Sequence, residues 1–438
     1  MNVKHRFGIR SMDPLSLANY VRLLCYFERQ PATASKGAKM PERTPPPIIA
    51  RCAVHLRDAG DATVNEIART LELSRTSVEN AVSALTDAGV VAEAAGGGSA
   101  GRAGRPARRY AFVADAGAVV GVDIGVASVR VLVADLTGRV IRQHRFEGIA
   151  QQPDGAAKLA VVIADIRAAL AEAAVPASRV RAIGVSLPGL VEDSGRVIAS
   201  VVIPDWSGVD IGAQLHQAFG CPVSVDNGVR LAAVAEHHLG VAQLVDDVVY
   251  LSVGNRIAMG LILAGRPRRG VHNAAGDIGR LAFRGIDADT GQIRWRTADT
   301  AAGVFALARE GHSGAQEEIA AFVDELAHGI ATLVMTIDPA MVVIGGGLSG
   351  AHGALLDPLR AALPRHIGLP FEVPLVEARL GADAAAHGAL VHAFRRHADA
   401  VYGIEGMPVP PVTPQRRPGT PSAPAPTTDP VPVAEEHP

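Results

Sequence analysis

The sequence has few cysteines and no long apolar run. It has only three cysteines, Cys25, Cys52 and Cys221, which lie far apart and match neither a zinc-ligand spacing nor a disulfide framework. We interpret them as reduced structural thiols, which favours a cytoplasmic protein. No run of 18 or more apolar residues occurs, and the polar N-terminus lacks the apolar core of a signal peptide. Export and membrane insertion are therefore not expected.

The length of the chain indicates several domains, and its charge is unevenly distributed along the sequence. A chain of 438 residues, 48% of them hydrophobic, predicts two or three domains with linkers. Residues 1–45 carry eight Lys/Arg and three Asp/Glu, and residues 46–114 carry eight and seven, although the whole chain has a net charge of −2. A basic front end suits a polyanionic partner, but a solvated basic tail has the same composition. We expect residues 1–45 to form a flexible basic extension.

Residues 46–114 predict a small helical domain. A first helix begins near residue 48, and Thr63 and Glu66 have the spacing of a capping box that opens a second, short helix. Ser74 can cap a third helix, which ends near Gly89. Two short helices with a tight turn, the second bearing small polar residues and an arginine near its N-terminus, have the geometry that enters a DNA major groove.

A glycine-rich loop follows, between segments 90–94 and 109–113 that could pair as a β-wing. The exit of the loop, GRAGRPARR, places four arginines within eight residues without an acid. Arginine flanked by Gly and Pro can lie in the narrow minor groove of DNA. The alternatives are an ordinary helical subdomain and a solvated linker. We expect contacts with double-stranded DNA from Arg75, Thr76, Ser77, Asn80, Arg102, Arg105 and Arg108.

The rest of the chain carries five motifs at domain-scale spacing. They are VVGVDIGVASVRVLVADLTGRV (119–140), VSLPGLV (185–191), VSVDNGVRLAAVAE (223–236), HNAAGDIGR (272–280) and DPAMVVIGGGLSG (338–350). The series resembles the ROK family of repressors and sugar kinases over about residues 117–400. The resemblance implies an α/β protein: a winged helix-turn-helix at 46–114, then a two-lobed, actin-like ATPase (ROK sugar-kinase-like) body at 115–403.

The phosphate loops and the catalytic base depart from the pattern of the family's sugar kinases. Val126 and Ala127 replace a Gly and the Thr of D-x-G-G-T, and Gly228 replaces the Asp that acts as base. Asn255 and Arg256 stand in the second phosphate loop, where the kinases carry G-T-G-I-G. The comparison with the family therefore implies no kinase activity, no catalytic residue and no cofactor.

Residues that hold a sugar in the family are partly retained. Asp277 stands for a Glu, and Arg280 replaces a His that contacts both the sugar and a structural zinc. The zinc motif is absent because residues 281–310 contain no Cys, which predicts no metal. Trp206 lies either near the sugar, as in the kinases, or in the core as a packing anchor. The predicted sugar-binding residues are Asn227, Asp277, Arg280 and Gly189.

The sequence therefore predicts a DNA-binding regulator, and repression is the family's usual mode. Its partners would be operator DNA and a sugar or sugar-phosphate effector. The alternatives are a ligand-blind regulator that uses the body only for dimerisation, and an ATP-dependent sugar kinase with a DNA-binding arm. A single winged helix makes few base contacts, so we expect a homodimer or dimer of dimers. Residues 404–438 hold 11 of the 29 prolines and predict a disordered tail.

Overall fold

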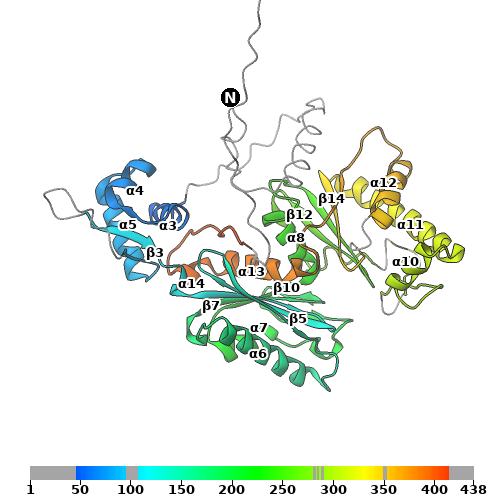
Figure 1. Cartoon of the computed structure of the whole chain (residues 1–438), viewed down its shortest axis with the longest axis horizontal. Helices are drawn as coiled ribbons and strands as arrows, with labels where there is room; N and C mark the ends of the chain where they lie inside the picture. The colour runs from blue at the N-terminus through cyan, green and yellow to red at the C-terminus, as the bar shows by residue number, and fades with distance from the viewer. Residues whose placement is uncertain are drawn as a thin grey trace, which may run out of the picture. The chain divides into compact units, whose positions relative to one another are not determined.

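The computed structural model describes residues 46–94, 107–279, 283, 286–287, 291–348 and 353–413 (Figure 1). All of them fall within Pro45–Gln415, one of the two units into which the chain divides. Several predictions lie outside the described residues. These are the extension 1–45, Arg102 and Arg105 of the wing, Arg280, and everything beyond residue 413.

The first described domain consists of three helices and a small antiparallel sheet. The helices are α3 (Ile48–Ala59), α4 (Val64–Leu71) and α5 (Arg75–Asp87). The strands are β1 (Ala62–Thr63), β2 (Val91–Glu93) and β3 (Arg109–Phe112), in the order β1-β3-β2. Val91 lies opposite Phe112, so the predicted wing strands pair. This is the arrangement of a winged helix-turn-helix.

Side-chain caps explain where α4 and α5 begin. The Thr63 hydroxyl accepts a hydrogen bond from the Glu66 amide at 3.2 Å, and the Glu66 carboxylate accepts one from the Thr63 amide at 2.8 Å. Glu72 then takes a left-handed conformation with φ +53°, which ends α4. Ser74 caps α5 by accepting from the Ser77 amide at 3.1 Å. The predicted capping box and cap are both confirmed.

The first lobe of the body is a five-stranded sheet in the order β10-β7-β4-β5-β6. Its strands are β4 (Ala118–Ile124), β5 (Ser128–Asp135), β6 (Val140–Glu147), β7 (Val180–Leu187) and β10 (Val223–Asn227). Because β7 and β10 run parallel to β4, their carboxyl ends meet at one edge of the sheet. Helices α6 (Gly155–Glu172) and α7 (Ile211–Phe219) cover one face (Figure 1).

The second lobe has a sheet in the order β13-β12-β11-β14-β15. Its strands are β11 (Val248–Val253), β12 (Ile257–Leu263), β13 (Arg266–Pro267), β14 (Met341–Gly345) and β15 (Leu375–Glu377). One face packs against α10 (Ala301–Arg309), α11 (Ser313–Ile337) and α12 (Gly353–Ile367). By length and composition α11 could cross a membrane, but Val323, Leu326 and Ile330 are buried in the lobe's core, as in a core helix.

Two helices, α8 (Gly228–His238) and α13 (Ala384–Arg396), pack closely between the sheets. A Cβ atom at Gly388 of α13 would lie 1.8 Å from the Leu231 carbonyl of α8. A Cβ atom at Gly184 of β7 would lie 1.9 Å from the Ala389 carbonyl. Glycine is required at both positions because the two backbones touch. Two lobes with a central helix pair confirm the predicted actin-like fold.

The segment 404–413 packs on the body, so the prediction of disorder is wrong for these residues. Helix α14 (Ala398–Tyr402) leads into it, and Met407 and Val412 are buried. The Val140 amide donates to the Thr413 carbonyl at 3.0 Å. Proline lacks an amide hydrogen but still accepts through its carbonyl, and the scattered apolar residues anchor the segment.

Candidate functional site

The exposed face of α5 carries three of the seven residues predicted to contact DNA. Arg75, Thr76 and Asn80 are exposed, whereas Val78 and Leu85 on the opposite face are buried. The Arg75 Nε atom lies 2.8 Å from a carboxylate oxygen of Glu79, one turn further along the helix. The fourth predicted residue, Ser77, is half-buried, and its hydroxyl lies 2.8 Å from the Ser74 hydroxyl within the cap.

The arginines after the wing loop have different roles. The Arg108 side chain is exposed and lies 3.7 Å from the Glu93 carboxylate, a loose ion pair. Arg109 points back into the domain, where its Nε donates to Asp61 at 2.6 Å and its Nη1 to Glu66 at 3.0 Å. Arg109 therefore ties β3 to the capping box of α4. The alternation of neighbouring side chains along a strand could have indicated that Arg108 and Arg109 face opposite sides.

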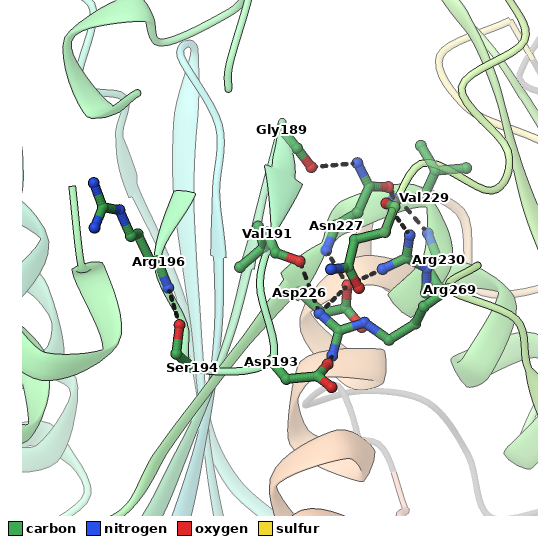
Figure 2. A network of polar contacts seen from close by, with 11 residues as sticks. Gly189, Val191, Asp193, Ser194, Arg196, Asp226, Asn227, Val229, Arg230 and Arg269 are labelled. Carbon is green, nitrogen blue, oxygen red and sulfur yellow. Dashed lines mark hydrogen bonds and ion pairs between the residues drawn. The ribbon is translucent and has the colours of Figure 1, made fainter. Parts of the chain in front are cut away.

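Asn227 lies at the carboxyl end of β10 and caps α8. Its side-chain oxygen accepts hydrogen bonds from the Val229 amide at 2.9 Å and the Arg230 amide at 3.3 Å. Its side-chain nitrogen donates to the Gly189 carbonyl at 2.9 Å (Figure 2). The structure thus brings together two predicted sugar-binding residues. One hydrogen of the Asn227 amide group remains for a ligand hydroxyl.

A buried ion-pair cluster lies directly below Asn227, at Asp226 (Figure 2). The side chains of Asp226 and Arg230 are each 4% exposed and form a short, charge-assisted hydrogen bond. Arg230 also donates to the Asn273 carbonyl at 3.0 Å. Burial lowers the pKa of the Arg230 guanidinium from its ordinary value, and the Asp226 carboxylate opposes this shift.

Arg269 joins the same cluster from the second lobe, just after β13. It lies 3.7 Å from Asp226, donates to the Val191 carbonyl at 3.0 Å, and pairs with Asp193 in the turn that follows β8 (Leu190–Val191). The sequence analysis missed Arg230, Arg269 and Asp193. Asp226 lies in β10 and Arg230 lies in the first turn of α8, so helical spacing does not indicate their pair. Nothing in the sequence pairs Arg269 with Asp193.

The other two predicted sugar-binding residues are only partly placed. Asp277 is exposed on the loop whose Asn273 carbonyl is held by Arg230. Arg280 lies outside the described residues. Trp206 is 1% exposed, and its indole nitrogen donates to the Gly155 carbonyl at 2.9 Å. The interpretation of Trp206 as a packing anchor is therefore confirmed.

The loop between β4 and β5, where a kinase would bind phosphate, is bordered by an internal ion-pair network. Asp123 accepts a hydrogen bond from Ser186 at 2.7 Å and lies 3.5 Å from Arg130, which also pairs with Asp383 at 3.4 Å. Burial raises the pKa of the Asp123 carboxyl above its ordinary value, while Ser186 and Arg130 oppose this shift. A Cβ atom at Gly228 would lie 3.0 Å from the Ser186 hydroxyl, so a larger side chain there requires Ser186 to move.

The loop between β11 and β12 is also held by contacts with another segment of the chain. The Asn255 carbonyl accepts a hydrogen bond from the Ile293 amide at 2.9 Å, and Arg256 forms an isolated β-bridge with Gln292. Burial lowers the pKa of Arg256. Gln292 and Ile293 belong to the stretch where a zinc module would stand, and within the described residues no group of three His, Cys, Asp or Glu side chains could hold a metal.

A family model for ROK proteins matches residues 119–293 and 280–395, which together span most of both lobes. The chain belongs to the ROK family. The xylose repressor of Caldicellulosiruptor bescii is 26% identical over 337 residues, which cover 68% of this chain and 82% of the repressor. The glucokinase of Halalkalibacterium halodurans is 27% identical over 312 residues, which cover 61% of this chain and 92% of the glucokinase.

Solved ROK structures include the same architecture. A ROK family transcriptional regulator, a homolog of the E. coli MLC protein, superimposes with a TM-score of 0.62 at 21% identity, covering 82% of this chain and 96% of that chain. At this identity the likeness concerns the fold. Repressors and sugar kinases thus both occur among the ROK relatives of the chain.

Proposed function

We propose that this ROK protein is a DNA-binding transcriptional regulator, acting as a repressor, whose body binds a sugar or sugar phosphate without phosphorylating it. The observation that carries the proposal is the exposed polar face of α5, where Arg75, Thr76 and Asn80 stand clear of a buried apolar face. Arginine and asparagine are the side chains that pair with guanine and adenine edges in the major groove. The kinship with the xylose repressor of C. bescii supports this reading.

The residues around Asn227 and the two neighbouring loops support sensing better than catalysis. Gly228 offers no carboxylate to accept a proton from a sugar hydroxyl, and the two loops that would bind phosphate are bordered or held by protein groups. A coupled assay of ATP turnover with hexoses should give no sugar-dependent rate. The double variant Gly254→Ala, Asn227→Ala changes the loop between β11 and β12 and the predicted sugar contact. A rate that disappears in this variant would overturn this part of the proposal. A rate that persists in that variant would come from a contaminating kinase.

The regulatory role is tested by operator binding with and without sugars. We would select duplexes from a random pool, and then titrate the best duplex in the presence of single sugars. Asn227→Ala should keep operator binding and lose release by sugar. Asn227→Ser is the matched control, since serine retains a cap for α8 but lacks the amide group. Release by sugar that survives in both variants would show that Asn227 does not contact the effector.

A second candidate function is a ligand-blind regulator. It is favoured by one observation: the Asn227 side chain is already engaged by Gly189 and by the first turn of α8. In that case the body serves only to pair two winged helices. The absence of any sugar effect on operator affinity would select this candidate over the sensor.

Both candidates require two DNA-binding domains on one operator, because one recognition helix contacts few base pairs. We expect a cytoplasmic homodimer, or a dimer of dimers, on an inverted repeat. In the sensor, ligand would alter the separation of the two winged helices and weaken DNA binding by its difference in affinity between the two states. Sedimentation should show a dimer at micromolar concentration. A monomer both with and without DNA would remove this mechanism.

A further inference from the structure

The ion-pair cluster at Asp226 contains an imbalance of charge and of hydrogen-bond acceptors. Two guanidinium groups, Arg230 and Arg269, face one buried carboxylate, Asp226. The second acid, Asp193, lies on an exposed turn, and its side chain is 70% exposed. Of the two acids that pair with these guanidinium groups, only Asp226 is buried, and the other is open to solvent.

Hydrogen-bond acceptors are also lacking at the Nε atoms of both arginines. Each is buried, and neither has a hydrogen-bond acceptor among the residues that the structure describes. The Nη atoms are occupied by Asp226 and the Asn273 carbonyl in Arg230, and by Asp193 and the Val191 carbonyl in Arg269. A buried N–H without an acceptor is unfavourable, so both guanidinium groups lack part of their normal hydrogen bonding.

Asp193 is the member of the cluster that a ligand can replace. It belongs to the first lobe, whereas Arg269 belongs to the second, so their ion pair joins the two lobes (Figure 2). Mainly the Asp193 side of this pair is open to water, which competes for its carboxylate and weakens the pair. A carboxylate or phosphate would offer Arg269 the planar or bidentate set of acceptors that a guanidinium prefers.

The groups for sugar hydroxyls and for an anion lie on neighbouring residues. Asn227 follows Asp226 directly, and its amide contacts Gly189, which lies two residues before Val191. We propose that the effector is an acidic or phosphorylated sugar, whose hydroxyls contact Asn227 and whose anionic group displaces Asp193 from Arg269. This proposal rests on the sensor function proposed above, and it defines the chemical class of the effector.

The test is a calorimetric titration of the full chain with four probes: glucose, glucuronate, glucose 6-phosphate and inorganic phosphate. We expect at least one of the two acidic sugars to bind about tenfold more tightly than glucose, because it adds a charge-assisted pair. The comparison of glucuronate with glucose 6-phosphate distinguishes a carboxylate from a phosphate source. Equal affinity for glucose and both acidic sugars would overturn the proposal and leave the sensor function standing.

Two variants and one control locate the effect. Arg269→Gln should abolish the preference for acidic over neutral sugar, whereas the neighbouring exposed Arg268→Gln should retain it. Asp193→Asn removes the internal competitor and should tighten binding of the acidic sugar several-fold. Since Asp193 is exposed, this variant remains informative even if Arg269→Gln folds poorly. Unchanged or weaker binding by Asp193→Asn would contradict displacement.

Two further outcomes separate this proposal from the function on which it rests. Binding of inorganic phosphate as tight as that of glucose 6-phosphate would overturn the role of the sugar hydroxyls. No binding of any probe, together with no effect of any sugar on operator affinity, would reject the sensor function and the proposed effector class and favour the ligand-blind regulator.

Discussion

Two arginines of this ROK protein lie in the first turn of a helix and pair with an acid four residues away, but their surroundings differ. Arg75 of α5 is 68% exposed beside Glu79, whereas Arg230 of α8 is 4% exposed beside Asp226. An exposed pair contributes about 0–1 kcal/mol. Removing one partner from a buried pair costs about 3–5 kcal/mol. Arg75 can therefore exchange Glu79 for a base edge, while Arg230 remains tied to Asp226 inside the body.

The largest expected effect comes from breaking the buried pair. Asp226→Ala leaves Arg230 without its carboxylate and should lower the free energy of unfolding by about 3–5 kcal/mol in urea denaturation. The matched change in the exposed pair, Glu79→Ala, should alter it by less than about 0.5 kcal/mol. Equal effects of the two variants would show that burial does not distinguish the pairs.

The next effect concerns DNA rather than stability. Arg75→Ala should weaken operator binding by about 1–3 kcal/mol, because a base contact is lost, while the denaturation midpoint stays unchanged. Arg69→Ala in α4 is the control for general charge. Like Arg75, Arg69 is exposed, but unlike Arg75 it has no ion-pair partner among the described residues. If both variants lost affinity equally for specific and scrambled duplexes, Arg75 would not read bases.

A smaller effect is expected at the cap that fixes the first turn of α5. Ser74→Ala removes the acceptor for the Ser77 amide and should cost about 1 kcal/mol of unfolding free energy. Ser83→Ala, an exposed serine in the middle of the same helix, should cost less. Chemical denaturation of both variants measures the difference, and a larger loss for Ser83→Ala would argue against the cap.

The smallest effect should follow from neutralising the acid beside Arg75. Glu79→Gln removes repulsion between a carboxylate and the DNA phosphates, so affinity for scrambled duplex should rise by less than about 0.5 kcal/mol. The rise should fade at high salt. Titrations with scrambled duplex at low and high salt measure it. A loss of affinity at both salt concentrations would contradict this account of Glu79.

Local signals in the sequence predicted much of the fold. Thr63, Glu66 and Ser74 act over three residues, so the caps of α4 and α5 could be read directly. The family resemblance, rather than a local pattern, grouped Gly189 with Asn227 as sugar-binding residues, and the structure places them near the ends of the parallel strands β7 and β10. The caps depend only on neighbours in the chain.

Contacts between distant segments could not be predicted in the same way. Arg269 meets Asp193 across 76 residues, and Arg109 meets Asp61 across 48. Such pairs depend on how the elements pack, which charge patterns alone do not reveal. The segment 404–413 failed for a related reason, because its proline content concealed the few apolar residues that pack on the body.

The reading of DNA sequence by α5 can be tested by comparing two duplexes. Fluorescence anisotropy of the full chain with a selected inverted repeat and with a scrambled duplex, at physiological salt, gives the ratio of the two dissociation constants. We predict a ratio of at least about 10³, the lower range for specific regulators, and a marked fall of this ratio in Arg75→Ala. Equal dissociation constants for the two duplexes with the wild-type chain would contradict this role of α5.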